Sequence, residues 1–212
     1  MPINYPVPFF SNTPDDTHCF QAAMKMVYEY FKPDEKLSFA EWDKISAKVE
    51  GLYTWQMAGL LWMAKDFYVT DIETFDYKRF IEEGGSYLHE LLGDEVAENQ
   101  IKNSDIEQEK RYAREFLDRI RIDRRAPAIN DITVLLDKNN LVVCNVNARV
   151  MNNKEGYAGH FVVVKGYDEE HLIVHDPGLP AYENRKVPYE LFMKAWAYPN
   201  KNALNLMAFQ LK

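Results

Sequence analysis

At 212 residues, with 47% hydrophobic and 14% aromatic residues, the chain has the composition of an ordinary globular protein and enough length for one substantial core. Its formal charge of -8, from 33 acidic and 25 basic residues, provides no basic face and argues against nucleic acid or an anionic membrane surface as a partner. We therefore expect a single domain over residues 1–212, and neither a disordered nor a fibrous chain.

The first residues of the chain predict an extended arm. Prolines at positions 2, 6, 8 and 14 oppose regular structure, and the stretch lacks the basic start and continuous apolar run of a signal peptide. No segment elsewhere is long and apolar enough to span a bilayer. These features predict a cytoplasmic protein, in which the two cysteines, Cys19 and Cys144, are expected to be free thiols.

Residues 13–31 predict a polar loop that leads directly into an amphipathic helix, which Pro33 ends. The apolar residues of this helix recur at three- and four-residue spacing: Phe20, Met24, Val27, Tyr28 and Phe31. The candidate N-cap residues are Asp15, Asp16 and Thr17. Cys19 would then lie in the first turn, where unpaired N–H groups and the helix dipole favour a thiolate.

Position alone does not make Cys19 a nucleophile, because a free cysteine more often serves as a small buried apolar side chain. Cys144 fits that second description, since it lies inside the strand-like run L-V-V-C-N-V-N. A nucleophilic Cys19 requires a base from elsewhere in the chain.

The middle of the chain predicts helices. A capping-box pattern at Ser38 opens one helix to about residue 48, and Thr54 opens a second, apolar one. Residues 67–126 predict a helical insertion that begins with a short extended piece, Y-V-T-D-I, and continues with helices near 77–83, 86–92 and 104–121. A second capping box at Ser104 opens the last of these helices. We interpret the mixed charges of this last helix as a solvated face.

The pattern changes after residue 127. A short helix over 129–136 is followed by strand-like runs at 141–147, 160–167, 171–175 and 203–211. Helices that precede antiparallel strands in this way predict an α+β fold.

His160 is the strongest candidate for the base, because it follows Gly159 at the start of a rigid apolar strand. If the strands 160–167 and 171–175 form a hairpin, Asp176 comes close to His160 and could orient its ring. Taken alone, Asp176 is equally well explained as the start of a turn before a proline. Asn12 could donate to a negative charge near the thiol or could be a turn residue.

These residues resemble a known family. A cysteine at the start of the first helix, followed by G-H-F-V-V-V-K-G-Y-D and H-L-I-V-H-D-P-G, is similar to the papain-fold cysteine peptidases of the bacteriocin-processing, double-glycine leader peptidase type and their stand-alone relatives. The resemblance implies a papain-like fold and a Cys19, His160 and Asp176 triad. A glutamine before the cysteine usually completes the oxyanion hole in that family, and the nearest amide here is Asn12.

The leading hypothesis is thus a cysteine peptidase or thiol hydrolase that acts on a peptide or an amide-bearing small substrate. The same groups would also support an acyltransferase or amidase. A third possibility is an inactive binding module whose cleft is filled by Phe20 and the insertion. A metal site made of His18, Cys19, His160 and His175 is the weakest alternative, because paired ligand spacing is absent. We expect no cofactor and no metal, and the sequence leaves the role of residues 68–126 open.

Overall fold

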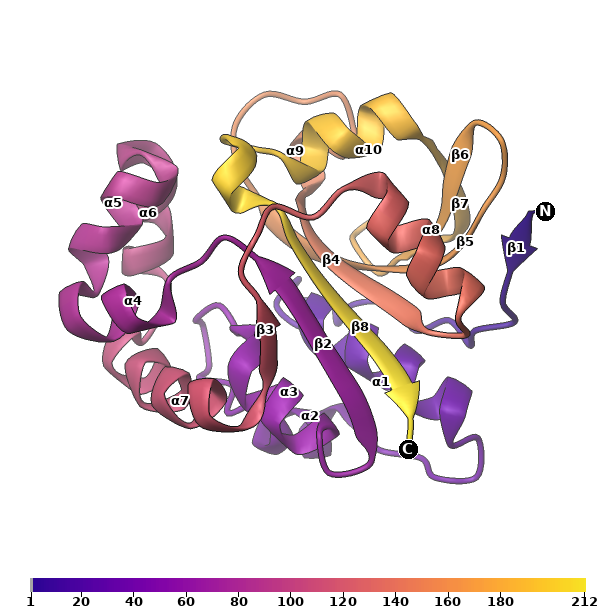
Figure 1. Cartoon of the computed structure of the whole chain (residues 1–212), viewed down its shortest axis with the longest axis horizontal. Helices are drawn as coiled ribbons and strands as arrows, with labels where there is room; N and C mark the ends of the chain where they lie inside the picture. Colours follow the sequence, from indigo (N-terminus) through magenta and orange to yellow (C-terminus); the bar gives the residue numbers. More distant parts are fainter. Residues whose placement is uncertain (1) are drawn as a thin grey trace.

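In the computed structural model, which describes residues 2–212, eight strands form one sheet that crosses the molecule diagonally in Figure 1. The strands are β1 (Ile3–Asn4), β2 (Phe67–Glu73), β3 (Arg121–Asp123), β4 (Leu141–Asn147), β5 (Gly159–Tyr167), β6 (His171–Asp176), β7 (Tyr182–Pro188) and β8 (Asn205–Leu211). Their order is β3-β2-β8-β4-β5-β6-β7, and β1 pairs with β5. Only the β2–β3 pair among these described strands is parallel.

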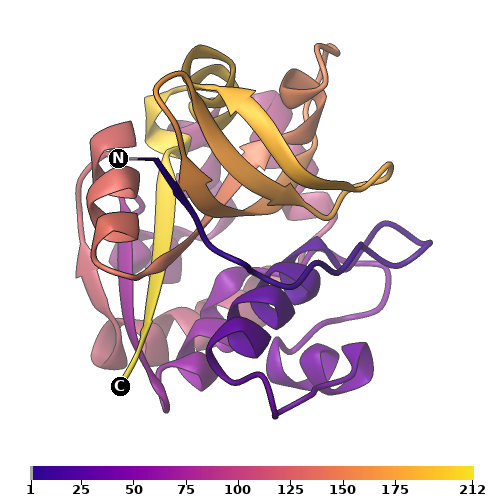
Figure 2. The same cartoon turned by 90° about the vertical axis from the view of Figure 1, so that its right-hand side faces the viewer.

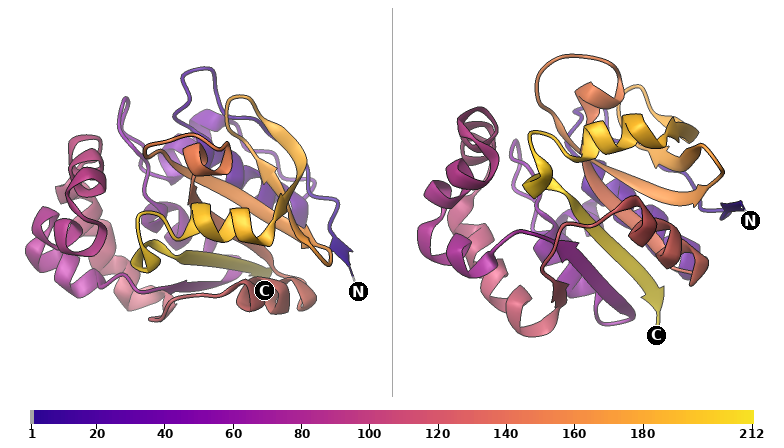
Figure 3. Two further views of the ribbon diagram at one scale, coloured as in Figure 1. Left: turned by 90° about the horizontal axis from the view of Figure 1, so that it is seen from above. Right: turned by 45° about the horizontal axis from the view of Figure 1, so that its top comes forward.

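Helices cover both faces and one end of this sheet (Figures 1 and 3). They are α1 (Cys19–Phe31), α2 (Phe39–Ile45), α3 (Gln56–Met63), α4 (Tyr77–Glu83), α5 (Gly85–Leu92), α6 (Asp94–Lys102), α7 (Ile106–Arg119), α8 (Ile129–Asp137), α9 (Ala148–Met151), α10 (Tyr189–Trp196) and the 3₁₀ turn η1 (Lys201–Ala203). Helices α1–α3 lie behind the sheet in Figure 1, α8–α10 in front of it, and α4–α7 beside one end. No helix within residues 2–212 combines the length and the apolar character needed to cross a bilayer.

The central strands are apolar on both sides, because both faces of the sheet are covered. In β4, Val143 packs toward α1–α3 while Cys144 belongs to the core beneath α8–α10. In β5, Val163 and Val162 alternate in the same way. The prediction of an α+β fold is confirmed, and Cys144 is a fully buried core residue on the face of the sheet opposite to α1.

Helix α1 lies against β5 and begins at Cys19, as the apolar spacing predicts. Its N-cap is His18, so the expectation that Asp15, Asp16 or Thr17 caps the helix is wrong. The Asp15 carboxylate instead accepts hydrogen bonds from the side chains of Thr13 and Thr17, which fold the preceding loop on itself. The loop, rather than a side-chain cap, therefore sets where the helix starts.

Two further predicted caps differ for a related reason. The capping box at Ser38 is present on α2, but the N-cap of α3 is Trp55 because the Thr54 hydroxyl accepts from the buried Gln21. Ser104 does not cap α7 either, since its hydroxyl accepts from the Trp55 indole at 2.9 Å and Asp105 takes the cap position. In both cases the hydroxyl accepts a hydrogen bond from a residue remote in sequence and does not cap its own helix.

The insertion predicted as helical over 67–126 is helical between Tyr77 and Arg119. Its first residues form β2, as the short extended piece predicts, and β2 pairs antiparallel with β8 from Phe67 to Glu73. Residues 121–123 return to the sheet as β3. Helix α6, strand β7 and helix α10 were not expected from the sequence.

The N-terminal arm runs between the β5–β7 part of the sheet and α1 (Figure 2). The Tyr5 N–H donates to the Lys165 carbonyl at 3.0 Å. His175, which is fully buried, lies 2.9 Å through its Nε2 from the Val7 carbonyl oxygen. The arm is thus tied to β5 and β6, the two strands that carry His160 and Asp176.

Candidate active site

The loop before α1 is held in place by the side chain of Asn12. Its Oδ1 accepts from the backbone N–H groups of Thr13 at 2.9 Å and His18 at 2.7 Å. Its Nδ2 donates to Asp16 Oδ1 at 2.8 Å, and its backbone N–H donates to the Pro177 carbonyl at 2.7 Å. Asn12 is only 5% exposed, so it fixes the residue next to Cys19 and links this loop to the turn that follows β6.

His160 and Asp176 meet across the β5–β6 hairpin, as its predicted pairing implies. The His160 Nε2 lies 2.8 Å from Asp176 Oδ1, and both side chains are buried. Because Val163 pairs with His175, Asp176 comes diagonal to His160 and not directly opposite it. The Gly178 N–H also donates to Asp176 Oδ1 at 3.0 Å, so two donors orient this carboxylate oxygen.

The half-buried Cys19 thiol lies near the His160 imidazole, so that each group shifts the pKa of the other. Burial alone would raise the pKa of Cys19, but the contact with His160 and its positive charge outweigh burial and hold the pKa below its ordinary value. Burial would likewise lower the pKa of His160, but Asp176 and Cys19 together raise it to about 10. The charged pair of thiolate and imidazolium is therefore the favoured form of the two groups.

Arg185, on the unexpected strand β7, completes the surroundings of Asp176. Its guanidinium donates to Asp176 Oδ2 at 2.7 Å and to the Met151 carbonyl at 2.5 Å. Although burial would raise the pKa of Asp176, its contacts with His160, Gly178 and Arg185 keep that pKa low. Nothing in the sequence pattern singles out Arg185, because β7 shows no apolar alternation and its pairing arises from the tertiary fold.

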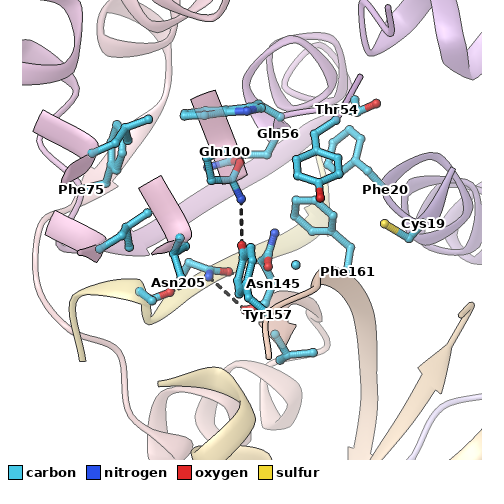
Figure 4. A pocket seen from close by; sticks show the side chains of 18 of the residues that line it. Cys19, Phe20, Thr54, Gln56, Phe75, Gln100, Asn145, Tyr157, Phe161 and Asn205 are labelled. Carbon is cyan, nitrogen blue, oxygen red and sulfur yellow. Dashed lines mark hydrogen bonds between the residues drawn. The ribbon is translucent and has the colours of Figure 1, made fainter. Parts of the chain in front are cut away.

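A cavity of about 220 Å³ opens beside Cys19 (Figure 4). Phe20 and Phe161, whose ring centroids are 5.0 Å apart, form its wall near the thiol. Figure 4 shows Tyr157 inside the pocket, where its hydroxyl accepts from Gln100 of α6 at 2.8 Å. The insertion thus contributes directly to the space next to the thiol.

His18 and His175, the other two histidines of the metal-site alternative, each have partners of their own. His18 contacts Thr13 through Nδ1 and lies 3.1 Å from Asp43 through Nε2, while His175 is bound to the N-terminal arm. Across residues 2–212, no group of three or more His, Cys, Asp or Glu side chains is arranged to hold a metal ion. The alternative of a metal centre thus lacks the ligand cluster that it requires.

A helix that begins at a cysteine and packs on an antiparallel sheet carrying a His–Asp pair defines the papain-like fold and a hydrolase of the cysteine peptidase type. The chain belongs to the Peptidase_C39 like family, whose sequence model matches residues 4–204. The resemblance to this kind of peptidase is therefore confirmed at the level of the family. No curated protein matches the chain.

Among the solved structures that share the fold are two peptidases. One is a candidate C39-like peptidase from Bacillus anthracis, with a TM-score of 0.54 and 17% identity over 100% of this chain and 98% of the other. The second is the peptidase domain of Streptococcus ComA, a bifunctional ABC transporter of a quorum-sensing pathway. It has a TM-score of 0.52 and 12% identity over 96% of this chain and 98% of the other. At these identities the likeness establishes the fold alone.

Proposed function

We propose that the protein hydrolyses a peptide or amide bond with Cys19 as nucleophile, His160 as base and acid, and Asp176 as the group that orients His160. The observation that carries the proposal is the position of the Cys19 thiol near an imidazole whose Nε2 lies 2.8 Å from Asp176 Oδ1. With Nε2 engaged, Nδ1 is the ring nitrogen available to the thiol. A thiolate beside an imidazolium is the reactive state of a nucleophilic cysteine.

In the first half of the proposed reaction, the Cys19 sulfur attacks the carbonyl carbon and the carbonyl oxygen becomes an oxyanion. Collapse of this intermediate breaks the C–N bond, and the proton carried by His160 passes to the leaving amine. The product is a thioester on Cys19. In the second half, His160 removes a proton from water, which attacks the thioester, releases the carboxylic acid and restores the thiolate.

Asn12 is proposed to stabilise the oxyanion together with the backbone N–H of Cys19. The first-turn N–H groups of a helix have no intrahelical acceptor, so that of Cys19 is available. The Oδ1 atom of Asn12 accepts hydrogen bonds from two backbone N–H groups. Its Nδ2 donates one of its two hydrogens to Asp16, so the second hydrogen remains available for the oxyanion. These hydrogen bonds also fit a residue that only shapes the loop. An experiment must therefore distinguish oxyanion binding from loop shaping.

The cavity is relevant to the two alternative functions, an inactive binding module and an acyltransferase or amidase. An inactive module with a filled cleft disagrees with the open space beside Cys19, because Phe20 forms a wall of that space. Acyl transfer uses the same thioester, and only the acceptor differs. Adding an amine acceptor to the assay distinguishes the two outcomes, since a transferase forms a new amide where a peptidase forms an acid.

The test is cleavage of a defined peptide mixture followed by mass spectrometry. Wild-type protein should produce new peptide termini and a transient adduct on Cys19, and Cys19→Ala should produce neither. Cys144→Ala, which removes the buried cysteine of the opposite core, is the matched control and should retain cleavage. Equal cleavage by the Cys19→Ala variant would exclude the proposed nucleophile.

A further inference from the structure

The cavity beside Cys19 contains polar groups that the proposed chemistry does not use. Glu73, Gln56 and Tyr77 line it, from β2, α3 and α4. The Tyr77 hydroxyl donates to Glu73 Oε1, and Gln56 Nε2 donates to the Tyr77 oxygen at 3.2 Å. In Figure 4, Gln56 and Phe75 lie in the part of the pocket away from Cys19.

The walls between these groups are apolar and come in part from the insertion. The lining residues of α5 and α6 include Leu88, Leu91, Leu92 and Val96. A cavity of about 220 Å³ is smaller than the roughly 300–1,000 Å³ of sites that enclose a whole small molecule. The cavity is large enough for one long side chain but too small to enclose an entire small-molecule ligand.

Within residues 2–212, the lining of the cavity contains carboxyl groups and no basic side chain. Asp16 and Glu73 line the cavity, and among the described residues no Lys, Arg or His does. Behind Glu73, on the same face of β2, the Asp71 carboxyl is fully buried and neither of its oxygens has a donor partner. Burial and the neighbouring charge of Glu73 raise the pKa of Asp71, burial raises that of Glu73, and no basic group contributes to either shift.

Two of the other buried carboxylates among the described residues have a built-in cation, whereas Asp71 and Glu109 have none and do not line the cavity. Glu29, 3% exposed, pairs with Lys25 and with Lys36. Asp176, 4% exposed, pairs with Arg185. Glu73 is 6% exposed and faces a cavity, yet it lacks such a partner, which leaves room for a cation supplied by a ligand.

We propose that this cavity binds the side chain of a substrate residue next to the scissile bond, and that this side chain ends in a protonated amine or guanidinium, as in lysine or arginine. The aliphatic stem would pack on the leucines of α5 and the aromatic rings near Cys19, and the cation would reach Glu73. The link to a scissile bond rests on the proposed peptidase function. The insertion then acts as the wall of a specificity pocket.

The test measures binding without turnover. The tripeptides acetyl-Gly-X-Gly-amide, with lysine, norleucine or glutamate as X, are titrated into the Cys19→Ala variant by calorimetry. Norleucine has the stem of lysine without its charge. We expect the lysine peptide to bind about tenfold more tightly than the norleucine peptide, and the glutamate peptide to bind least.

The Glu73→Gln substitution, made in the same variant, should reduce the lysine preference to about one. Glu109→Gln is the matched control, because Glu109 is a 5% exposed carboxyl on α7 that does not line the cavity. It should leave the preference unchanged. Equal or tighter binding of the norleucine peptide, or a lysine preference that survives Glu73→Gln, overturns the proposal.

A second substitution keeps the test valid if Glu73→Gln fails to fold. Leu92 is partly exposed at the end of α5 and lines the cavity, so Leu92→Trp should fill it without disturbing the core and weaken binding of the lysine peptide at least about tenfold. Unchanged binding would place the peptide elsewhere. Tight lysine-dependent binding by a protein that cleaves nothing would contradict the proposed function and leave the pocket assignment intact.

Discussion

The guanidinium of Arg185 donates a hydrogen bond to Asp176 Oδ2 at 2.7 Å, while His160 occupies Oδ1 of the same carboxylate at 2.8 Å. Asp176 therefore lies between two basic side chains. A carboxylate held on both oxygens is fixed in rotation and kept ionised, so it can hold the imidazole in one orientation. The Arg185 contact with the Met151 carbonyl ties this arrangement to α9.

Arg185→Gln should lower the rate of peptide cleavage about tenfold, because a charged hydrogen bond to Asp176 is lost. Removing the cation should also move the alkaline limb of the pH–rate profile upward, since positive charge near His160 opposes its protonation. A purely structural role would not move that limb. Arg125→Gln, which breaks the exposed Arg125–Asp131 pair, is the matched control and should preserve both rate and profile.

The rate of Cys19 alkylation by iodoacetamide, measured against pH, should have its midpoint below the value of about 8.5 for an ordinary thiol. In His160→Ala the burial of Cys19 remains but the imidazolium is lost, so the midpoint should rise to about 8.5 or higher. Cys144 should stay unlabelled in the folded protein, because it is fully buried and burial raises its pKa. Identical midpoints in the two proteins would contradict the thiolate–imidazolium pair.

Asn12→Ala should reduce turnover about 100- to 1,000-fold and leave alkylation of Cys19 largely intact, if Asn12 donates to the oxyanion. Asn12→Asp separates this role from loop shaping, because Asp keeps an oxygen for the Thr13 and His18 N–H groups but lacks the donor. It is best made together with Asp16→Asn, which avoids two facing carboxylates. Full activity of this double variant would assign Asn12 to the loop alone, and the Asp16→Asn single variant is its control.

Glu109→Gln should stabilise the protein at neutral and higher pH. Burial raises the pKa of Glu109 to about 8, so the folded chain holds a proton that the unfolded chain releases above about pH 4.3. Between these values the folded state binds more protons, and its stability falls as pH rises. The gain from Gln should therefore be about 1 kcal/mol at pH 5 and about 4–5 kcal/mol at pH 8.

Urea unfolding at the two pH values measures this difference. Glu107→Gln, on the exposed side of the same helix, serves as the control and should change stability little at either pH. A gain from Glu109→Gln that is equal at pH 5 and pH 8 would mean that Glu109 titrates alike in both states.

Elements with a strong local pattern were predictable. The Phe20 to Phe31 spacing gives α1, the capping box at Ser38 gives α2, and the run 141–147 coincides with β4. Helix α10 does have a local signal in the sequence, since Phe192 and Trp196 lie four residues apart and Pro188 precedes the helix. Strand β7 carried none, since its residues are mostly exposed and its conformation follows from pairing with β6.

By itself the sequence determined the α+β class, most of the helices and strands, the position of Cys19 at a helix start and the approach of Asp176 to His160, because each depends on contacts within one helix or one hairpin. Only the tertiary structure decided that α1 carries Cys19 to His160, that Arg185 reaches Asp176, and that Glu73 faces the cavity without a cation. The physical reason is that side chains remote in sequence meet only where the packing of whole helices and strands brings them together. The periodicity of apolar residues along the chain predicts single elements but does not predict how these elements pack.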